Sequence, residues 1–281
     1  MKPNTFILGA PKCGTTSLAD WLRSHPEVFV CPGKEPHYFN DDSGQQLTKD
    51  LESYESLFRG VSDERIIIDA SVWYLYSETA VRNIERYRPD AKYIVCIRNP
   101  MDAVPSLYLE HLYAGVESLG SLCAAWVASG ARREGRHVPA VCRDSRLLDY
   151  TSVYKYCKQL ERLLALVDLK RIHIVVLDDL AKNPVEVMEG VSNFLGLSGH
   201  SWSNLERKNV SKRRVFPQWN GLLVKIGRTK ERFPWIRSFG VLRFLKSINT
   251  AKSKPLEISE DLRKDIEREY DCDVRRLSAL L

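Results

Sequence analysis

Long apolar runs are missing from this sequence of 281 residues. No stretch reaches the roughly 18 consecutive apolar residues that a membrane-spanning helix needs. The first four residues lead almost directly into a strand-like segment, without the apolar stretch that is typical of a signal peptide. We therefore expect neither a transmembrane segment nor a secretion signal.

Cysteine is also scarce. The seven cysteines are odd in number, form no Cys-x-x-Cys pair and lie largely in apolar periodic segments. This pattern is typical of reduced thiols, which are the rule in the cytosol. We therefore expect a cytoplasmic protein.

Acidic residues are nearly absent from one part of the chain. Between Arg207 and Lys254 there are 14 Lys and Arg but only one acid, Glu231, which gives a local charge of +13. Because the whole chain carries +6, the remainder carries −7. Such a concentration of positive charge indicates an anionic partner near this segment.

The sequence does contain a regular alternation of apolar runs and helical patterns. Four short apolar runs are typical of buried strands, at residues 5–8, 65–69, 92–98 and 171–177. Helical patterns separate them, one after the first strand that ends at His25-Pro26, and others at 78–87, 102–113, 153–167 and 185–195. The alternation predicts an α/β fold with a central parallel sheet flanked by helices, which binds ligands beyond the carboxyl ends of its strands.

The length and the hydrophobic content of 44% are sufficient for one sizeable core, so we expect a single domain over residues 1–281. Within it, we expect an α/β core at residues 5–200 and a closing amphipathic helix at 259–281. Between them, residues 204–255 are basic, aromatic and rich in glycine, and we expect them to form loops over the ligand site.

The most informative stretch lies between the first strand and the first helix and reads Gly9-Ala10-Pro11-Lys12-Cys13-Gly14-Thr15-Thr16. Small residues let the backbone curl so that its N–H groups point inward, and the helix dipole adds positive charge, which makes a cradle for an anion. The glycines keep the spacing of the nucleotide-triphosphatase loop G-x-x-x-x-G-K-[ST], but Thr15 takes the lysine position and the lysine has moved to Lys12. There a cation would lie beside the bridging oxygen of a two-unit anhydride.

The string from Pro11 to Thr16 resembles the P-K-x-G-T-T loop of the sulfotransferases that use 3′-phosphoadenosine-5′-phosphosulfate, especially the branch with the heparan sulfate enzymes and bacterial relatives. The resemblance implies a P-loop-like fold, no metal, and adenosine 3′,5′-bisphosphate as the product. It also implies that Lys12 is catalytic and that the loop grips the 5′-phosphosulfate. The residues that would bind it are Pro11, Lys12, Cys13, Gly14, Thr15 and Thr16.

A second block, from Arg98 to Ser106, is similar to the 3′-phosphate site of that family, in which an arginine and a serine eight residues later hold the phosphate. On the residues alone, Arg98 ends a strand, Pro100 opens a helix and Ser106 lies about two turns into it. The guanidinium and the hydroxyl can therefore approach one phosphate. A salt bridge between Arg98 and Asp102 is the alternative. Two phosphate-type sites at consecutive strand ends favour a bisphosphorylated nucleotide.

The segment after the first helix, Lys34-Glu35-Pro36-His37-Tyr38-Phe39, is similar to the K-E-x-H-F-F string of the heparan sulfate branch, where the glutamate is the general base. An acceptor hydroxyl must lose its proton as it attacks sulfur, and a carboxylate within hydrogen-bond reach can take it. The resemblance thus implies Glu35 as the base, with His37 as the second candidate. The alternatives are a surface pair of Glu35 with Lys34 and a hydrogen-bonded core histidine at His37.

The segment Asp69-Ala70-Ser71-Val72-Trp73-Tyr74 matches a family segment that often reads E-K-[ST]-P-x-Y. Ala70 replaces the lysine that assists at the sulfonate, and Val72 replaces the proline, so the chain departs here from the heparan sulfate enzymes. Trp73 and Tyr74 are candidates for the acceptor pocket or for simple core residues.

The resemblance continues to about residue 215. Tyr156 opens a matching segment and is counted with the nucleotide-binding candidates, whereas residues 157–160, 175–180 and 194–197 are expected to be structural. Lys212, Arg213 and Arg214 lie where the family has a basic loop over the 3′-phosphate, and a solvated run of charge is the alternative.

These residues predict a sulfotransferase that moves a sulfonate group to a hydroxyl or an amine of a glycan, a lipid or a small metabolite, with no nucleic acid as partner. One rival function is a P-loop kinase in which Asp69 holds magnesium, but the missing lysine after Gly14 disfavours it. The other is a catalytically silent nucleotide-binding or membrane-surface protein. The presence of both Lys12 and Glu35 disfavours that function.

The basic segment supplies the first testable prediction. Its cations are interleaved with aromatic residues, which suits an anionic acceptor or peripheral binding to an anionic membrane, although inward-packing aromatics would give the same pattern. Exposed charges are screened beyond about 8 Å at physiological ionic strength. Vesicle binding and acceptor affinity should therefore weaken at high salt and after charge reversal of Lys225, Arg228, Lys230 and Arg232. Co-sedimentation with anionic and neutral vesicles, and the acceptor KM, measure this; no response to salt or reversal contradicts it.

Overall fold

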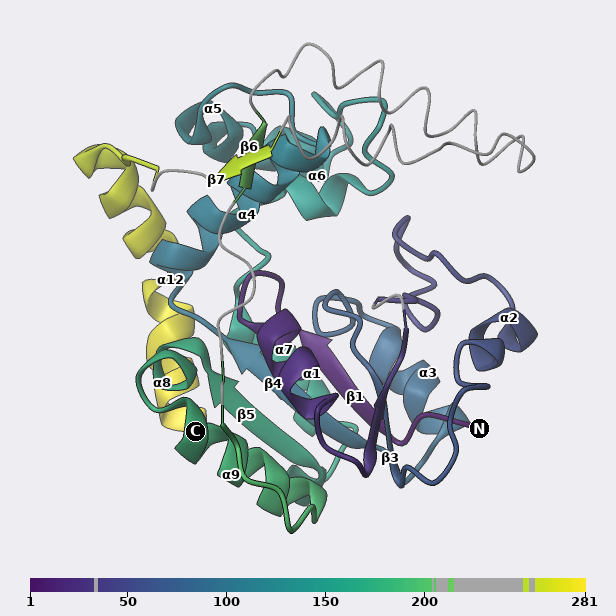
Figure 1. The fold of residues 1–281 in the computed structure, drawn as a ribbon. Coiled ribbons are helices and arrows are strands. Elements are labelled where there is room, and N and C mark those ends of the chain that lie inside the picture. The colour runs from purple at the N-terminus through teal and green to yellow at the C-terminus, as the bar shows by residue number, and fades with distance from the viewer. Residues whose placement is uncertain (33–34, 204, 206–211, 215–249, 253–255) are drawn as a thin grey trace.

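The computed structural model describes residues 1–32, 35–203, 205 and 256–281, together with the backbone of 212–214 and 250–252. Five strands form one parallel sheet (Figure 1). In chain order they are β1 (Thr5–Gly9), β2 (Val28–Val30), β3 (Ile66–Asp69), β4 (Lys92–Ile97) and β5 (Ile172–Val176). Their order across the sheet is β2-β3-β1-β4-β5, so β1 lies in the middle. The α/β fold predicted from the sequence is confirmed.

The apolar runs form strands because helices cover both faces of the sheet. All five residues of β1 are buried, and so are all four residues of β3. The sequence pattern does not predict β2, because its three residues are too few to show a period.

The helical patterns correspond to helices whose bounds differ from the predicted ones by a few residues, some shorter and some longer. They are α1 (Thr15–Leu22), α3 (Ala80–Tyr87), α4 (Pro100–Ala114), α7 (Tyr156–Leu164), α9 (Pro184–Leu195) and the closing helix α12 (Glu260–Leu280). The structure adds short helices that the periodicity does not predict, namely α2 (Leu51–Ser56), α5 (Leu122–Val127), α6 (Ser129–Arg133), α8 (Leu177–Lys182) and the 3₁₀ turns η1 (Ser145–Leu148) and η2 (Leu169–Arg171). Helices of three to six residues span too few turns to show a 3.6-residue period.

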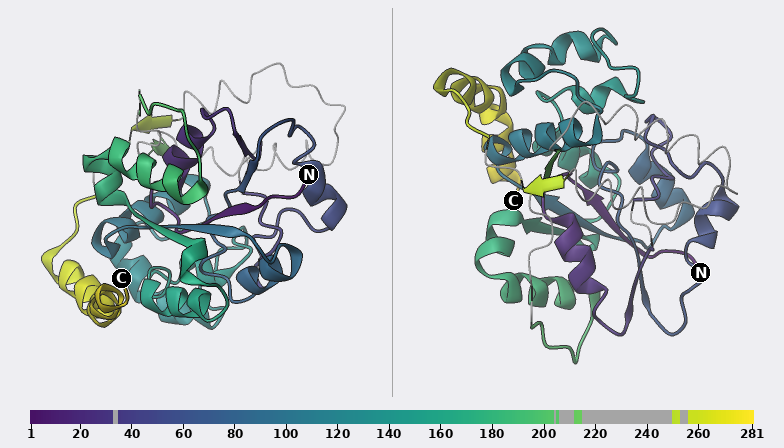
Figure 2. Two further views of the ribbon diagram at one scale, coloured as in Figure 1. Left: turned by 90° about the horizontal axis from the view of Figure 1, so that it is seen from below. Right: turned by 45° about the horizontal axis from the view of Figure 1, so that its top comes forward.

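The helices form a layer on each side of the sheet. Figure 2 shows α1 and α9 on one face and α3, α7 and α12 on the other. The closing helix α12 packs on α7 and α4. The Tyr270 hydroxyl donates to the carbonyl of Tyr150 at 2.5 Å, and Asp273 accepts from the backbone N–H of Cys157 at 3.0 Å. Polar contacts as well as apolar packing therefore hold the last helix against the core.

Helices α4, α5 and α6 extend beyond the carboxyl end of the sheet (Figure 1). A fully buried ion pair holds this part together: both guanidinium nitrogens of Arg132 reach Glu117 at 2.6 Å. The Tyr150 hydroxyl also donates to Glu117, at 3.1 Å. Although burial opposes it, the hydrogen bonds and the charge of Arg132 lower the pKa of Glu117. Removing either partner of this pair would leave the other charge buried and unpaired, which is strongly destabilising.

The predicted basic segment contains two short strands, β6 (Lys212–Arg214) and β7 (Thr250–Lys252), which pair antiparallel. Strand β6 lies beside α4. The other residues between 206 and 255 lie outside the described part of the chain. Among the described residues, no helix is long and apolar enough to cross a membrane. All seven cysteines are described, and each is a free thiol.

Candidate active site

The loop between β1 and α1 is shaped by two glycines with positive φ. A Cβ on Gly9 (φ +134°) would lie 2.2 Å from the carbonyl oxygen of Val72, and one on Gly14 (φ +84°) would lie 2.7 Å from Leu177. Any larger side chain would therefore displace the neighbouring backbone or core. Gly14 is also the N-cap of α1, so the loop ends at the positive end of a helix.

Two buried tyrosines support this loop from beneath. The Tyr154 hydroxyl donates to the carbonyl of Pro11 at 3.1 Å, and the Tyr156 hydroxyl lies 3.3 Å from Sγ of Cys13. Burial raises the pKa of the Cys13 thiol to about 12, so this thiol stays protonated at neutral pH. Tyr156 is 1% exposed and also accepts from the backbone N–H of Arg98 at 3.3 Å. It joins the loop to the end of β4, and its predicted contact with a nucleotide stays a prediction.

The two predicted phosphate sites meet at this edge of the sheet. A guanidinium nitrogen of Arg98 donates to the carbonyl of Lys12 at 3.4 Å. In the described part of the chain, Arg98 has this contact rather than the salt bridge with Asp102. Asn99 accepts from the N–H of Met101 and so caps α4, which carries Ser106, partly exposed, along its second turn. Lys12 and Arg98 thus lie at one edge of the sheet.

A carboxylate that the sequence analysis does not identify lies beside Lys12. The ammonium of Lys12 is 2.5 Å from Oε2 of Glu110, an exposed residue on α4. Glu110 comes 98 residues after Lys12 in the chain, so no local pattern connects them. The one available signal is that Glu110 lies four residues after Ser106, which puts both on one face of a helix.

The two candidate bases form a pair. Nε2 of His37 lies 3.2 Å from Oε2 of Glu35. The His37 side chain is 4% exposed and that of Glu35 is 29% exposed, so the carboxylate is the more accessible of the two. The backbone N–H of His37 donates to the hydroxyl of Ser71 at 3.1 Å. His37 is therefore a hydrogen-bonded, buried histidine that contacts the carboxylate, and Lys34 lies outside the described residues.

The three predicted catalytic residues share an unusual backbone. Lys12 (φ +63°), Glu35 (φ +74°) and His37 (φ +48°) have left-handed conformations, and His137 is the one other non-glycine residue of this kind in the described part of the chain. Such residues are uncommon, cost about 1–3 kcal/mol each, and cluster at functional sites. The catalytic roles of Lys12, Glu35 and His37 stay predictions, since His137 shares this conformation.

A buried carboxylate at the end of β3 organises the loop that carries Glu35. Asp69 is 0% exposed and accepts from the hydroxyls of Ser71 (2.7 Å), Tyr54 (2.8 Å) and Tyr74 (3.0 Å). Burial raises the pKa of Asp69, although these hydrogen bonds oppose the rise. The Tyr74 hydroxyl in turn accepts from the N–H groups of Tyr38 and Phe39 at 2.9 and 3.3 Å. Tyr74 is thus a core residue and not part of a pocket surface.

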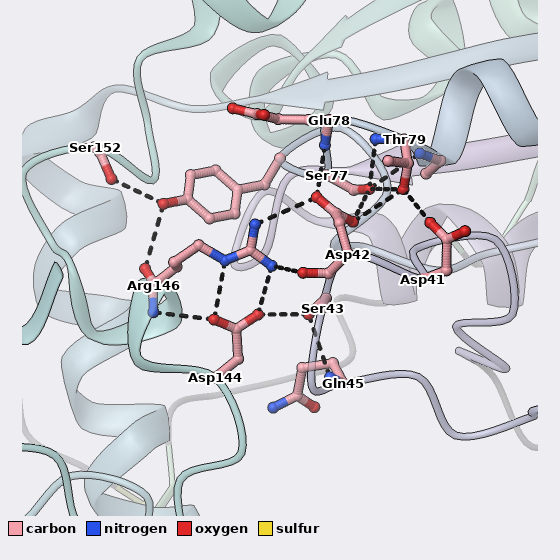
Figure 3. Close-up of polar contacts among 12 residues, drawn as sticks. Asp41, Asp42, Ser43, Gln45, Ser77, Glu78, Thr79, Asp144, Arg146 and Ser152 are labelled. Atoms are coloured by element: carbon pink, nitrogen blue, oxygen red, sulfur yellow. Dashed lines mark hydrogen bonds and ion pairs between the residues drawn. The ribbon is translucent and has the colours of Figure 1, made fainter. Parts of the chain in front are cut away.

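The next part of the same loop is held by an arginine between two aspartates. The Arg146 guanidinium contacts Asp144 at 2.9 and 3.0 Å and Asp42 at 3.2 Å, as Figure 3 shows. Asp42 also accepts from the Ser77 hydroxyl at 2.5 Å and from the N–H of Glu78 at 3.0 Å. Although burial opposes it, these hydrogen bonds lower the pKa of Asp42. The contacts thus join three separate chain segments, around residues 42, 77–78 and 144–146.

Two other groups of predicted site residues lie elsewhere in the fold. Trp73 is 8% exposed and stacks on His111 with ring centroids 6.3 Å apart, so it packs mainly as core. The backbone of Lys212, Arg213 and Arg214 lies beside α4, the helix of Ser106. Their side chains are outside the described part of the structure, so their phosphate contacts stay predictions.

Comparison with known proteins gives consistent results. The model of the sulfotransferase domain family matches residues 2–233. The bifunctional heparan sulfate N-deacetylase/N-sulfotransferase 1 of Caenorhabditis briggsae is 27% identical over 245 residues, which cover 82% of this chain and 27% of that protein. The human heparan sulfate glucosamine 3-O-sulfotransferase 6 is 34% identical over 110 residues, or 39% of this chain and 31% of that protein. The chain therefore spans less than a third of the length of these relatives.

Among solved structures, the sulfotransferase from Alicyclobacillus acidocaldarius has a similar fold. The TM-score is 0.73, at 24% sequence identity, and the match covers 100% of this chain and 96% of the other. The likeness shows that the arrangement of strands and helices is shared.

The Asp69 network supplies a prediction of stability. Tyr74→Phe removes a donor to a buried carboxylate and an acceptor for two backbone amides, and should cost about 1–3 kcal/mol in the free energy of unfolding. Tyr87→Phe is the matched control, because its hydroxyl donates to Glu55 at 3.0 Å from a less buried position. It should cost under about 1 kcal/mol. Urea unfolding measures both, and equal losses would contradict the assigned role of Tyr74.

Proposed function

Because this chain belongs to the sulfotransferase domain family, we propose that it transfers a sulfonate group from 3′-phosphoadenosine-5′-phosphosulfate to a hydroxyl or an amine of an acceptor. The observation that carries the proposal is the meeting of the Lys12 loop and Arg98 at one edge of the sheet, where the Arg98 guanidinium contacts the Lys12 carbonyl at 3.4 Å. A donor with a 5′-phosphosulfate and a 3′-phosphate needs two adjacent anion sites of this kind.

The residues at this edge fit that donor chemically. Lys12 and the amides at the start of α1 offer positive charge to the phosphosulfate. Arg98 offers a planar fork of donors and Ser106 a hydroxyl to the 3′-phosphate. The contact of Arg98 with the Lys12 carbonyl is long, at 3.4 Å, and the side chain is only partly buried, so the guanidinium can bind a stronger acceptor at little cost.

The acceptor side requires a group that takes a proton. As the new bond from the acceptor atom to sulfur forms, the bond from sulfur to the bridging oxygen breaks, and the acceptor proton passes to the Glu35 carboxylate. His37, 3.2 Å from that carboxylate, holds it in position. Lys12 stabilises the charge that develops on the departing adenosine 3′,5′-bisphosphate, as preorganised cations do in phosphoryl transfer.

The kinase alternative is weakened by the position of Asp69. Both of its oxygens accept hydrogen bonds from buried hydroxyls, and the side chain is 0% exposed. A carboxylate so occupied is a poor ligand for a magnesium ion that must also reach a nucleotide. The alternative of a silent binding protein is weakened by the Glu35–His37 pair, which pure nucleotide binding does not need.

For the acceptor, the proposal names a chemical class and not a single molecule. The names of the matched relatives refer to heparan sulfate and to glucosamine, so glucosamine-containing glycans are the first acceptors to test, followed by lipids and small metabolites. A cytoplasmic location and a peripheral contact with an anionic membrane are also part of the proposal. They are supported by the free thiols and by the basic composition of residues 207–254.

The donor assignment predicts which nucleotide stabilises the protein. Adenosine 3′,5′-bisphosphate should raise the unfolding temperature, because a ligand that binds only the folded state adds about 2.7 kcal/mol at a hundred times its Kd. ATP with magnesium should raise it much less, because its phosphates form one chain and leave the Arg98 site empty. Thermal unfolding with each nucleotide is the measurement. Equal or greater stabilisation by ATP would overturn the proposed function.

The two catalytic roles predict different effects of mutation. Lys12→Ala should lower both turnover and nucleotide affinity, because Lys12 contacts the donor. Glu35→Gln should lower turnover by about a hundred- to ten-thousand-fold and leave nucleotide affinity unchanged, because a general base acts on the acceptor alone. Titration calorimetry with adenosine 3′,5′-bisphosphate and mass spectrometry of sulfonated acceptors separate the two. Near-normal turnover of Glu35→Gln would assign the base role to His37 or to another residue.

A further inference from the structure

An acidic side chain lies where an anion-binding site would be expected to exclude one. Oε2 of Glu110 is 2.5 Å from the ammonium of Lys12, in the loop proposed to bind the phosphosulfate. The Glu110 side chain is 50% exposed and that of Lys12 is 18% exposed, so the carboxylate is the more accessible partner of the pair. It is also one helical turn beyond Ser106, on the same face of α4.

The packing of α4 does not depend on this carboxylate. The next residue, His111, is buried, stacks on Trp73 and lies 3.2 Å from the Tyr150 hydroxyl, so the core contacts of this turn come from His111. Glu110 instead contacts the loop from an exposed position. Its contribution to the site is therefore its negative charge beside Lys12.

The distance to the reacting group follows from the geometry of Lys12. An oxygen bound by the ammonium would lie about 2.8 Å from Nζ, at a normal length for a charged hydrogen bond. The Glu110 carboxylate is then within about 6 Å of that oxygen. At such a separation, in the effective dielectric of a protein surface, one unit charge changes binding by about tenfold or more.

We propose that Glu110 sets the charge of the acceptor, admitting an ammonium or a neutral hydroxyl beside the reacting atom and disfavouring a carboxylate or a sulfate there. This inference rests on the proposed function, in which Lys12 binds the transferring group. With the donor bound, Lys12 is shared with an anion and neutralises Glu110 less, so the acceptor meets a net negative charge. A polyanionic, sulfated glycan is then a poor acceptor, and an amino sugar with a free amine is a good one.

A series of tetrasaccharides of equal length tests the acceptor charge. Chitosan tetrasaccharide is cationic, its fully N-acetylated form is neutral, and the carboxymethylated N-acetylated form is anionic. Titration calorimetry at low salt measures their binding to protein saturated with adenosine 3′,5′-bisphosphate. The wild type should bind the cationic and neutral forms at least about tenfold more tightly than the anionic form, and Glu110→Gln should reduce this preference by about tenfold.

A matched control separates the local charge from net charge. Lys155, the N-cap residue of α7, and Glu269 of α12 form an ion pair of the same length, 2.5 Å. Glu269→Gln removes the same charge from a pair that is not part of the loop, and should leave the acceptor preference at the wild-type value. Thermal scans of both variants check that their unfolding temperatures are equal, so that a change in acceptor preference does not reflect a loss of stability.

A second measurement, of nucleotide binding, tests the effect of the Glu110 charge without any acceptor. The 5′-phosphate of adenosine 3′,5′-bisphosphate also binds beside Lys12 in the proposed function, so Glu110→Gln should tighten the binding of this nucleotide by about tenfold. Glu269→Gln should leave this affinity unchanged.

The outcomes are distinct. A preference for the anionic tetrasaccharide in the wild type, or the same preference in Glu110→Gln as in the wild type, overturns the inference. If no tetrasaccharide binds, the affinity for adenosine 3′,5′-bisphosphate decides, and an unchanged affinity in Glu110→Gln overturns the inference. Failure of the wild type to bind this nucleotide overturns the proposed function itself, and the inference with it.

Discussion

The parallel pairing of β1 with β3 on one side and β4 on the other is the constraint on which the site depends. Thr5 is aligned with Ile68 of β3 and with Lys92 of β4, so the three strands run in the same direction and end at one edge of the sheet. Each strand ends there at a segment of the candidate site: the loop of Lys12 follows β1, Asp69 is the last residue of β3, and Arg98 follows β4. Residues nearly ninety positions apart in the chain, such as Lys12 and Arg98, thereby come into contact.

A buried polar network then gives the acceptor side its shape. Asp69 has lost all contact with water, and that loss is offset by hydrogen bonds from three hydroxyls. Two of those hydroxyls, on Ser71 and Tyr74, also accept from backbone amides of the loop that carries His37. The loop therefore keeps Glu35 and His37 in left-handed conformations that would be unfavourable in a free peptide. The buried carboxylate acts on the candidate base through this loop.

Charge at the site is balanced rather than simply positive. Lys12 contacts the carboxylate of Glu110, and Arg98 contacts a carbonyl oxygen. An anionic nucleotide can replace the weak partner of Arg98, whereas it has to share Lys12 with the Glu110 carboxylate. An unpaired cation would attract any anion, whereas a shared one favours a ligand that offers several oxygens in the right places. The same sharing is what makes Glu110 relevant to the acceptor.

The sequence by itself determined the four longer strands, the main helices, the glycine-containing loop between β1 and α1, and the family, because these depend on local periodicity and on a contiguous motif. It also singled out Lys12, Glu35 and His37, whose backbone conformations are unusual in the structure as well. Only the tertiary structure decided that Tyr156 lies beneath the loop, that Tyr74 is bound to Asp69, and that Glu110 contacts Lys12. These contacts depend on how distant parts of the chain pack together. The hydrophobic periodicity of the sequence does not show which side chains meet in this way.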